Sequence, residues 1–186
     1  MPLTIPTLLT LLRIVLIPVL VVVFYLPFEA ANQLTVALFI LAAVTDGLDG
    51  WIARRWGMTS SFGAFLDPVA DKLMVTAALL LIVQRHPEIG IALSAAVIIG
   101  REITISALRE WMAALGEAGR VKVAWVGKIK TILQMVAIGF LLYGEPLFFI
   151  PVLEIGRWLL IVAAALTIWS MCIYLRAAWP AVREQS

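Results

Sequence analysis

Apolar runs of a length that can cross a lipid bilayer divide this 186-residue chain. A membrane-spanning helix needs about 20 mainly apolar residues. Hydrophobic residues make up 63% of the chain and charged residues only 14%, whereas soluble domains carry about 25% charged residues. We therefore expect an all-α polytopic membrane protein with six transmembrane helices, forming one membrane domain over residues 1–186. The predicted spans are Leu8–Leu26, Leu34–Ala53, Gly63–Val83, Ile89–Leu108, Val123–Tyr143 and Trp158–Ala178.

The distribution of basic residues predicts that both termini are cytoplasmic. With a cytoplasmic N-terminus, the side opposite to the cytoplasm carries only Arg85 and Arg157, and the other basic clusters fall on the cytoplasmic half. This asymmetry follows the positive-inside rule. The segment before Leu8 is expected to lie at the membrane interface, with Pro6 in the first turn of a helix.

Four aspartates lie within 26 residues of this apolar sequence. A carboxylate at the centre of a membrane costs about 2.5–3.5 kcal/mol on insertion scales, so such residues indicate a functional site. Asp46 and Asp49 are three residues apart, and Asp67 and Asp71 are four apart, so each pair shares one helix face. Both pairs are centred near residue 58 of an antiparallel hairpin. If the two faces meet, the four side chains form a compact carboxylate cage.

Such a cage would suit a pair of divalent metal ions. Mg²⁺ and Mn²⁺ prefer oxygen ligands, and two ions about 3.5–4 Å apart are a common arrangement for displacement at phosphorus. His86 is expected on the far side of the membrane, and the single Cys172 excludes a cysteine metal cluster. Gly50, Ala53 and Gly63 would let a nucleotide approach the backbone, although small residues also serve ordinary helix packing.

The spacing of these residues reads D-x2-D-G-x2-A-R-x8-G-x3-D-x3-D from Asp46 to Asp71, with Arg54 as the fixed arginine. This pattern is the signature of the CDP-alcohol phosphotransferase family, which the chain resembles from Ile5 to about Tyr174. Further matching segments are residues 5–13, 62–72, 101–111 and 127–131. The chain departs from the family at Thr4, where relatives often carry Asn.

The resemblance implies transfer of the phosphatidyl group from CDP-diacylglycerol to sn-glycerol 3-phosphate, with release of CMP. It implies that Asp46, Asp49 and Asp67 mainly hold Mg²⁺ or Mn²⁺, and that Asp71 is the general base and a further metal ligand. It also implies a homodimer in the bacterial cytoplasmic (inner) membrane, with its active site facing the cytoplasm. Membrane lipids, and no nucleic acid, are the expected macromolecular surroundings.

A phosphorylated acceptor needs cationic partners. Arg101 and Arg109 are eight residues apart on nearly one helix face, and Lys128 and Lys130 open the fifth span. We expect these four residues to bind the acceptor phosphate, for which the arginine fork is well suited. The alternative is that basic residues at span ends are topological anchors or contacts to anionic lipids.

Arg13 and Arg54 are assigned, with the small residues of the signature, to binding of the nucleotide donor. Arg13 lies within the first apolar run, where a buried partner is expected. That partner is either the nucleotide phosphates or a signature carboxylate.

Three other functions remain open at this stage. The first is a sibling enzyme that uses inositol phosphate, serine or phosphatidylglycerol as acceptor. The second is a membrane prenyltransferase, whose Asp-rich motifs usually lie on separate hairpins of a larger bundle. The third is a divalent-cation transporter, which would need carboxylates distributed along a pathway.

Overall fold

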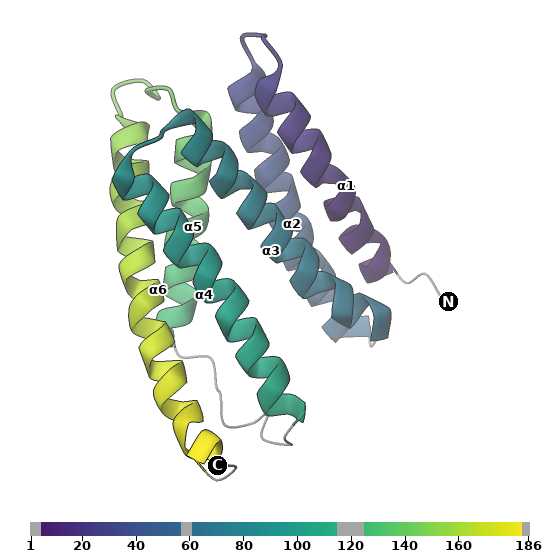
Figure 1. The fold of residues 1–186 in the computed structure, drawn as a ribbon. Helices are drawn as coiled ribbons and strands as arrows, with labels where there is room; N and C mark the ends of the chain where they lie inside the picture. The colour runs from purple at the N-terminus through teal and green to yellow at the C-terminus, as the bar shows by residue number, and fades with distance from the viewer. Residues whose placement is uncertain (1–4, 57–60, 115–124, 184–186) are drawn as a thin grey trace. The chain divides into compact units, whose positions relative to one another are not determined.

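A computed structural model describes residues 5–56, 61–114 and 125–183 and shows an all-α protein (Figure 1). Each predicted span coincides with a helix, which confirms the helical assignment of all six apolar runs. The helices in the described ranges are α1 (Ile5–Tyr25), α2 (Ala31–Trp56), α3 (Ser61–Arg85), α4 (Ile89–Ala114), α5 (Trp125–Tyr143) and α6 (Val152–Arg183). Pro6 lies in the first turn of α1, as expected.

The start of α6 differs from the prediction, because the helix begins at Val152 and not near Trp158. The charged residues Glu154 and Arg157 interrupt the apolar run here. They form an ion pair one turn apart, with Arg157 Nη1 2.7 Å from Glu154 Oε1. Such a pair supports a helix, so the charged turn extends α6 where apolar content alone predicts a break.

Four segments of the described chain are long and apolar enough to cross a membrane: Thr7–Tyr25, Ala31–Asp49, Ile89–Ala114 and Val152–Arg176. The apolar part of α5, Ile129–Tyr143, is shorter. The first half of α3 carries the charged residues Asp67, Asp71 and Lys72, which lower the hydropathy of this helix. The protein is therefore a multi-pass membrane protein.

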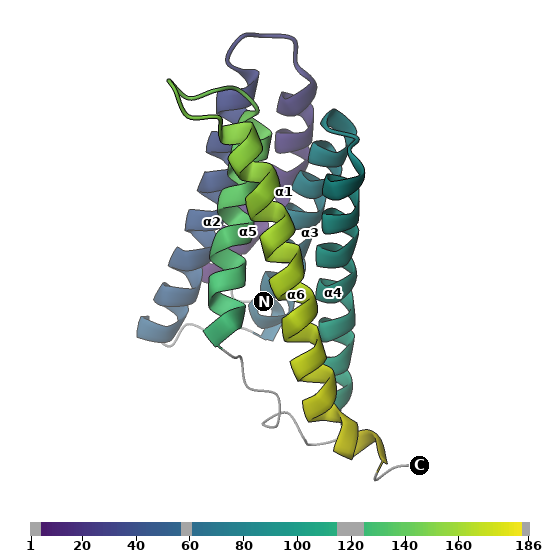
Figure 2. The same cartoon turned by 90° about the vertical axis from the view of Figure 1, so that its left-hand side faces the viewer.

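The chain forms two compact units. The first comprises Met1–Arg85 and Gly139–Leu153, and the second comprises His86–Ile138 and Glu154–Ser186. In the first unit, α1 packs along both α2 and α3, whereas α2 and α3 contact each other much less. In the second unit, α4, α5 and α6 run side by side (Figure 2). Because α1 packs along both other helices, its side chains can reach the carboxylates of α2 and of α3.

Some hydroxyl groups inside the apolar helices are satisfied by the backbone of their own helix. Thr35 Oγ1 donates to the carbonyl oxygen of Ala31 at 2.7 Å, and Thr167 Oγ1 donates to that of Ala163 at 2.6 Å. An unpaired polar group in hydrocarbon costs several kcal/mol, about 4–8 kcal/mol on the cyclohexane scale. These bonds let the helices carry polar side chains without a partner on another helix.

A cluster around Arg85, here called the Arg85 cluster, joins several elements at one end of the first unit. Arg85 Nη1 donates to Asn32 Oδ1 at 2.9 Å and to the carbonyl oxygen of Leu142 at 3.1 Å. Its guanidinium lies over the ring of Phe24, 3.9 Å from the centroid. Asn32 Nδ2 in turn donates to Glu145 Oε1 at 2.9 Å. Burial lowers the pKa of Arg85, and the charge of Glu145 opposes that shift.

Candidate active site

The signature carboxylates lie on the second half of α2 and the first half of α3. Because both segments are continuous helices, Asp46 and Asp49 share a face of α2, and Asp67 and Asp71 share a face of α3. Their exposure differs. Asp49 is buried, Asp46 and Asp67 are half-buried, and Asp71 is exposed. Asp71 is thus the carboxylate of this set that a dissolved molecule reaches most easily.

Arg13 of α1 bridges the two carboxylates of α2. Its Nη1 lies 2.7 Å from Asp46 Oδ1, and its Nη2 forms an ion pair with Asp49 Oδ2. Arg13 is only 1% exposed, so this charge depends almost entirely on its partners. The sequence predicts either the nucleotide phosphates or a signature carboxylate as the partner of Arg13. In the structure, two signature carboxylates fill this role. The Nε of Arg13 is buried and has no hydrogen-bond partner in the described ranges.

Thr10 is the second polar side chain that α1 directs to the carboxylates. It is fully buried, and its hydroxyl donates to Asp67 Oδ1. Thr10 and Arg13 are three residues apart, so they lie on one face of α1. Sequence reasoning missed Thr10. Its signal was the one-turn spacing to Arg13 within an otherwise apolar run.

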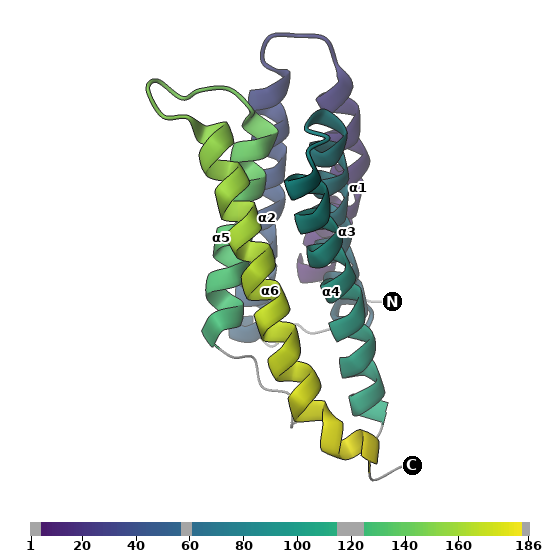
Figure 3. The same ribbon diagram turned by 60° about the vertical axis from the view of Figure 1, so that its left-hand side comes forward.

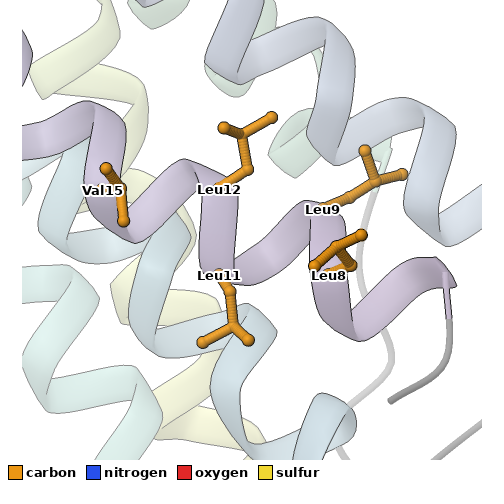
Figure 4. A pocket seen from close by; sticks show the side chains of 5 residues that line it. All are labelled: Leu8, Leu9, Leu11, Leu12 and Val15. Atoms are coloured by element: carbon orange, nitrogen blue, oxygen red, sulfur yellow. The ribbon is translucent and has the colours of Figure 1, made fainter.

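The other face of α1 is apolar. Leu8, Leu12 and Val15 are exposed there, and with Leu9 and Leu11 they line a shallow hollow (Figure 4). Exposed leucine and valine are suited to contact with lipid chains. One face of α1 is therefore suited to contact with lipid, and the opposite face contacts the carboxylates.

The four signature carboxylates are the candidate metal ligands of the first unit. Among the described residues, no three Asp, Glu, His or Cys side chains are arranged to hold a metal ion together. In place of such a group, Arg13 of α1 pairs with the carboxylates of α2, and Thr10 of the same helix donates to Asp67 of α3. The chemistry of the donors still fits Mg²⁺ or Mn²⁺, because all four are carboxylates. The side chain of Asp46 is also 46% exposed, which leaves it open to an ion.

Several predicted donor-binding residues lie on the same two helices. Gly63 is buried in the first turn of α3. Gly50, Ala53 and Arg54 lie within α2, but their side chains fall outside the described part of the structure.

A cluster of polar side chains lies within the second unit. It contains three of the four residues predicted to bind the acceptor phosphate. Glu102 of α4 accepts a hydrogen bond from Arg101 Nη1 at 2.9 Å and from Lys130 Nζ of α5 at 2.8 Å. The guanidinium groups of Arg101 and Arg109 lie 5.5 Å and 5.9 Å from the ring centroid of Tyr174 on α6. We call these five residues the basic cluster. Lys128 lies in the first turn of α5, but its side chain is outside the described residues.

The basic cluster has an excess of positive charge. Three cations in it face one carboxylate, and Arg101 and Lys130 are both buried. The Nε of Arg101 is also buried without a hydrogen-bond partner in the described part of the chain. An anion such as phosphate would supply both the missing acceptor and the missing negative charge.

Glu102 and Tyr174 are members of the basic cluster that sequence reasoning did not predict. Glu102 stands beside Arg101 in the sequence, yet nothing local indicates that it reaches Lys130, 28 residues away. Tyr174 is 4% exposed and lies 65 residues from Arg109. The one property of Tyr174 that could have indicated this role in the sequence is its aromatic ring, which can stabilise a neighbouring guanidinium.

Comparison with known proteins agrees with the signature. The sequence pattern of the CDP-alcohol phosphatidyltransferase family matches residues 3–169. A protein of Salmonella typhimurium (strain LT2) named CDP-diacylglycerol–glycerol-3-phosphate 3-phosphatidyltransferase is 52% identical over 178 residues, 96% of each chain. A protein of the same name from Haemophilus influenzae is 51% identical over 179 residues, 96% of this chain and 95% of its own. The match spans nearly the whole sequence and includes every fixed position of the signature, and the chain belongs to the CDP-alcohol phosphatidyltransferase family.

Proposed function

We propose that this protein transfers the phosphatidyl group of CDP-diacylglycerol to sn-glycerol 3-phosphate, which yields phosphatidylglycerophosphate and CMP. The observation that carries this proposal is the identity of 51–52% over almost the full length to relatives whose names state this donor and this acceptor. The signature supports the reaction type, and the basic cluster supports an acceptor that carries its own phosphate.

The carboxylates would hold the divalent ions that the family chemistry implies. We assign Asp46, Asp49, Asp67 and Asp71 to two Mg²⁺ or Mn²⁺ positions. Such ions, when bound, neutralise the diphosphate of the donor and the charge that develops on the leaving phosphate. Arg13 contributes compensating positive charge at Asp46 and Asp49, and Thr10 orients Asp67 through its hydroxyl.

Asp71 is the residue that we assign as general base. The acceptor hydroxyl must lose a proton as its oxygen attacks the β-phosphorus of the donor, and a carboxylate at the edge of the site can accept it. Asp71 is exposed, whereas Asp49 is buried against Arg13. The more accessible of these two carboxylates is the better base.

Donor binding is assigned to Arg54, Arg13 and the small residues Gly50, Ala53 and Gly63. Small residues let a bulky nucleotide approach the helix backbone, and Arg54 would contact a phosphate or a signature aspartate. The buried Nε of Arg13 is a further donor that a phosphate oxygen could satisfy.

The acceptor phosphate is assigned to the basic cluster together with Lys128. Arg101, Arg109 and Lys130 supply the charge, while Glu102 holds Arg101 and Lys130 at fixed positions through its two ion pairs. Pre-positioned donors bind an anion with a smaller loss of side-chain entropy. The ring of Tyr174 lies close to both guanidinium groups and can stabilise their charge by cation–π interaction.

A direct assay of CMP release tests the proposed reaction. We expect purified protein in detergent to release CMP when CDP-diacylglycerol, Mg²⁺ and sn-glycerol 3-phosphate are present together. Inositol phosphate, serine and phosphatidylglycerol should each give little release in parallel reactions. Preferential release with one of these three would identify a sibling enzyme, and no release with any acceptor would leave a non-enzymatic role such as cation transport.

Substitutions in the basic cluster test the acceptor site. Arg101→Ala or Arg109→Ala is expected to raise the KM for sn-glycerol 3-phosphate by about tenfold to a hundredfold, since a hydrogen bond to a charged group contributes about 1.5–3 kcal/mol. The KM for CDP-diacylglycerol should change much less. The measurement is initial rates of CMP release with each substrate varied in turn. Arg176→Ala, at an exposed position of α6, is the control, and an unchanged acceptor KM in both cluster variants would remove these arginines from the site.

The membrane arrangement extends the same proposal. We infer that all six helices span the bacterial cytoplasmic membrane, with both termini and the carboxylates on the cytoplasmic side, as the positive-inside rule favours. The chain would act as one membrane domain, which the family match across residues of both units supports. A homodimer is the expected assembly, with membrane lipids around it.

A further inference from the structure

The connection between α5 and α6 ends in a tight turn that carries two exposed phenylalanines. Leu147 and Ile150 exchange both of their backbone hydrogen bonds, with N–O distances of 3.1 Å and 2.9 Å. Between them, Phe148 is 89% exposed and Phe149 is 101% exposed. Figure 3 shows this connection extending away from the last turn of α5. We call these four residues the Phe148–Phe149 turn.

The backbone of this turn is unfavourable for the residue that occupies it. Phe148 has a φ of 55°, and it is the one non-glycine residue with a positive φ in the described part of the chain. Glycine adopts this left-handed conformation readily, while a bulky residue rarely does. Two aromatic rings with this much exposure are also unfavourable in water. Neither local backbone preference nor solvation by water therefore accounts for a phenylalanine at this position.

The position of the turn along the chain brings it to the membrane surface. It joins the apolar helical segment Ile129–Tyr143 to the candidate span Val152–Arg176, so it lies where these helices leave the hydrocarbon. Glu145, two residues before the turn, accepts a hydrogen bond from Asn32 in the Arg85 cluster. The α1–α2 connection next to that cluster exposes apolar Leu26 and Phe28 as well. This end of the first unit thus combines the charged, hydrogen-bonded Arg85 cluster with exposed apolar side chains in the two helix connections.

We propose that the Phe148–Phe149 turn is a lipid anchor whose two rings insert at the boundary between headgroups and acyl chains. Aromatic side chains are favoured at this depth of a bilayer. Burial of both rings in lipid offsets the strain of the left-handed residue, which directs Phe148 and Phe149 away from the protein. The anchor fixes the depth of the α5–α6 connection, and it does not depend on the proposed reaction.

Spin labelling in vesicles tests this proposal. The exposed Cys172 is first replaced in Cys172→Ser, and a nitroxide is then attached through Phe149→Cys. The protein is reconstituted in vesicles of phosphatidylethanolamine and phosphatidylglycerol, and collision rates of the label with oxygen and with a water-soluble nickel chelate are compared. We expect collisions with oxygen to dominate at position 149. The matched control is Glu145→Cys in the same connection, where the order should reverse.

Two results would overturn the lipid anchor. Dominant collisions with the nickel chelate at position 149 would place the turn in water. Strong dipolar broadening between labels, lost on dilution with unlabelled protein, would show that a second copy of the chain covers the turn.

A glycine substitution separates the ring from the turn. Phe148→Gly relieves the left-handed strain and preserves the backbone, so any change reports the loss of the ring. The label at position 149 should then become more accessible to the nickel chelate. Unchanged accessibility would remove Phe148 from the anchor.

Discussion

Asp71→Asn is expected to lower the kcat for CMP release by about 10²- to 10⁴-fold, the usual contribution of a positioned general base. The amide keeps the size of the side chain and cannot accept the proton of the acceptor hydroxyl. Asp71 is the last fixed residue of the signature and is exposed on α3, so its replacement should leave the fold intact. Binding of CDP-diacylglycerol should be retained because Asp46, Asp49 and Asp67 remain.

The measurement is kcat from initial rates, with donor affinity measured separately by equilibrium binding in detergent. Glu29→Gln is the matched control, since it makes the same carboxylate-to-amide change at an exposed position in the α1–α2 connection. A turnover close to that of the natural protein in Asp71→Asn would refute the assignment of this residue as base. Equal loss of donor binding and turnover would instead assign Asp71 mainly to the metal.

Arg13→Met should destabilise the protein by about 3–5 kcal/mol, the cost of removing one partner from a buried ion pair. Arg13 is 1% exposed and is bonded to two carboxylates, of which Asp49 is itself buried. Methionine fills much of the volume but removes the guanidinium that neutralises the charge of Asp49. The free energy of unfolding in mixed micelles, followed by circular dichroism during titration with denaturing detergent, measures the effect.

Arg157→Met is the matched control for this experiment. Arg157 also bridges two carboxylates, Glu88 and Glu154, but the side chains of these partners are 47% and 57% exposed. Exposed ion pairs contribute about 0–1 kcal/mol, so this variant should unfold almost like the natural protein. Equal destabilisation by both substitutions would show that burial does not increase the contribution of the Arg13 ion pairs to the free energy of unfolding.

The double variant Arg13→Met with Asp49→Asn isolates the contribution of charge. If the cost of Arg13→Met comes from a buried carboxylate charge that the guanidinium no longer neutralises, replacing Asp49 by Asn should restore part of the lost stability. Two residues in contact are expected to show such non-additive behaviour. Additive losses in the double variant would point to packing as the cause.

Much of the fold follows from local properties of the sequence. Apolar runs predict the helices because the preference for hydrocarbon and the backbone hydrogen bonding of a helix involve only nearby residues. The same periodicity predicts that Asp46 shares a face with Asp49 and that Asp67 shares one with Asp71. The early start of α6 was missed, because an ion pair within one turn can extend a helix where hydropathy falls.

Contacts between helices were harder to predict, because spacing along one helix does not specify which neighbour its face meets. The hairpin spacing predicts that α2 and α3 bring their carboxylates together, but it does not indicate that α1, which packs along both helices, supplies Arg13 and Thr10 as partners. In the basic cluster, the link from Glu102 to Lys130 and the ring of Tyr174 depend on three helices packing side by side.

The sequence by itself therefore determined the helices, the eight fixed residues of the signature and the family. The tertiary structure alone decided that Arg13 and Thr10 are the partners of the carboxylates, and that Glu102 balances Arg101 and Lys130. The physical reason is that helix formation depends on short-range hydrogen bonds, whereas the compensation of a buried charge depends on where a distant helix packs.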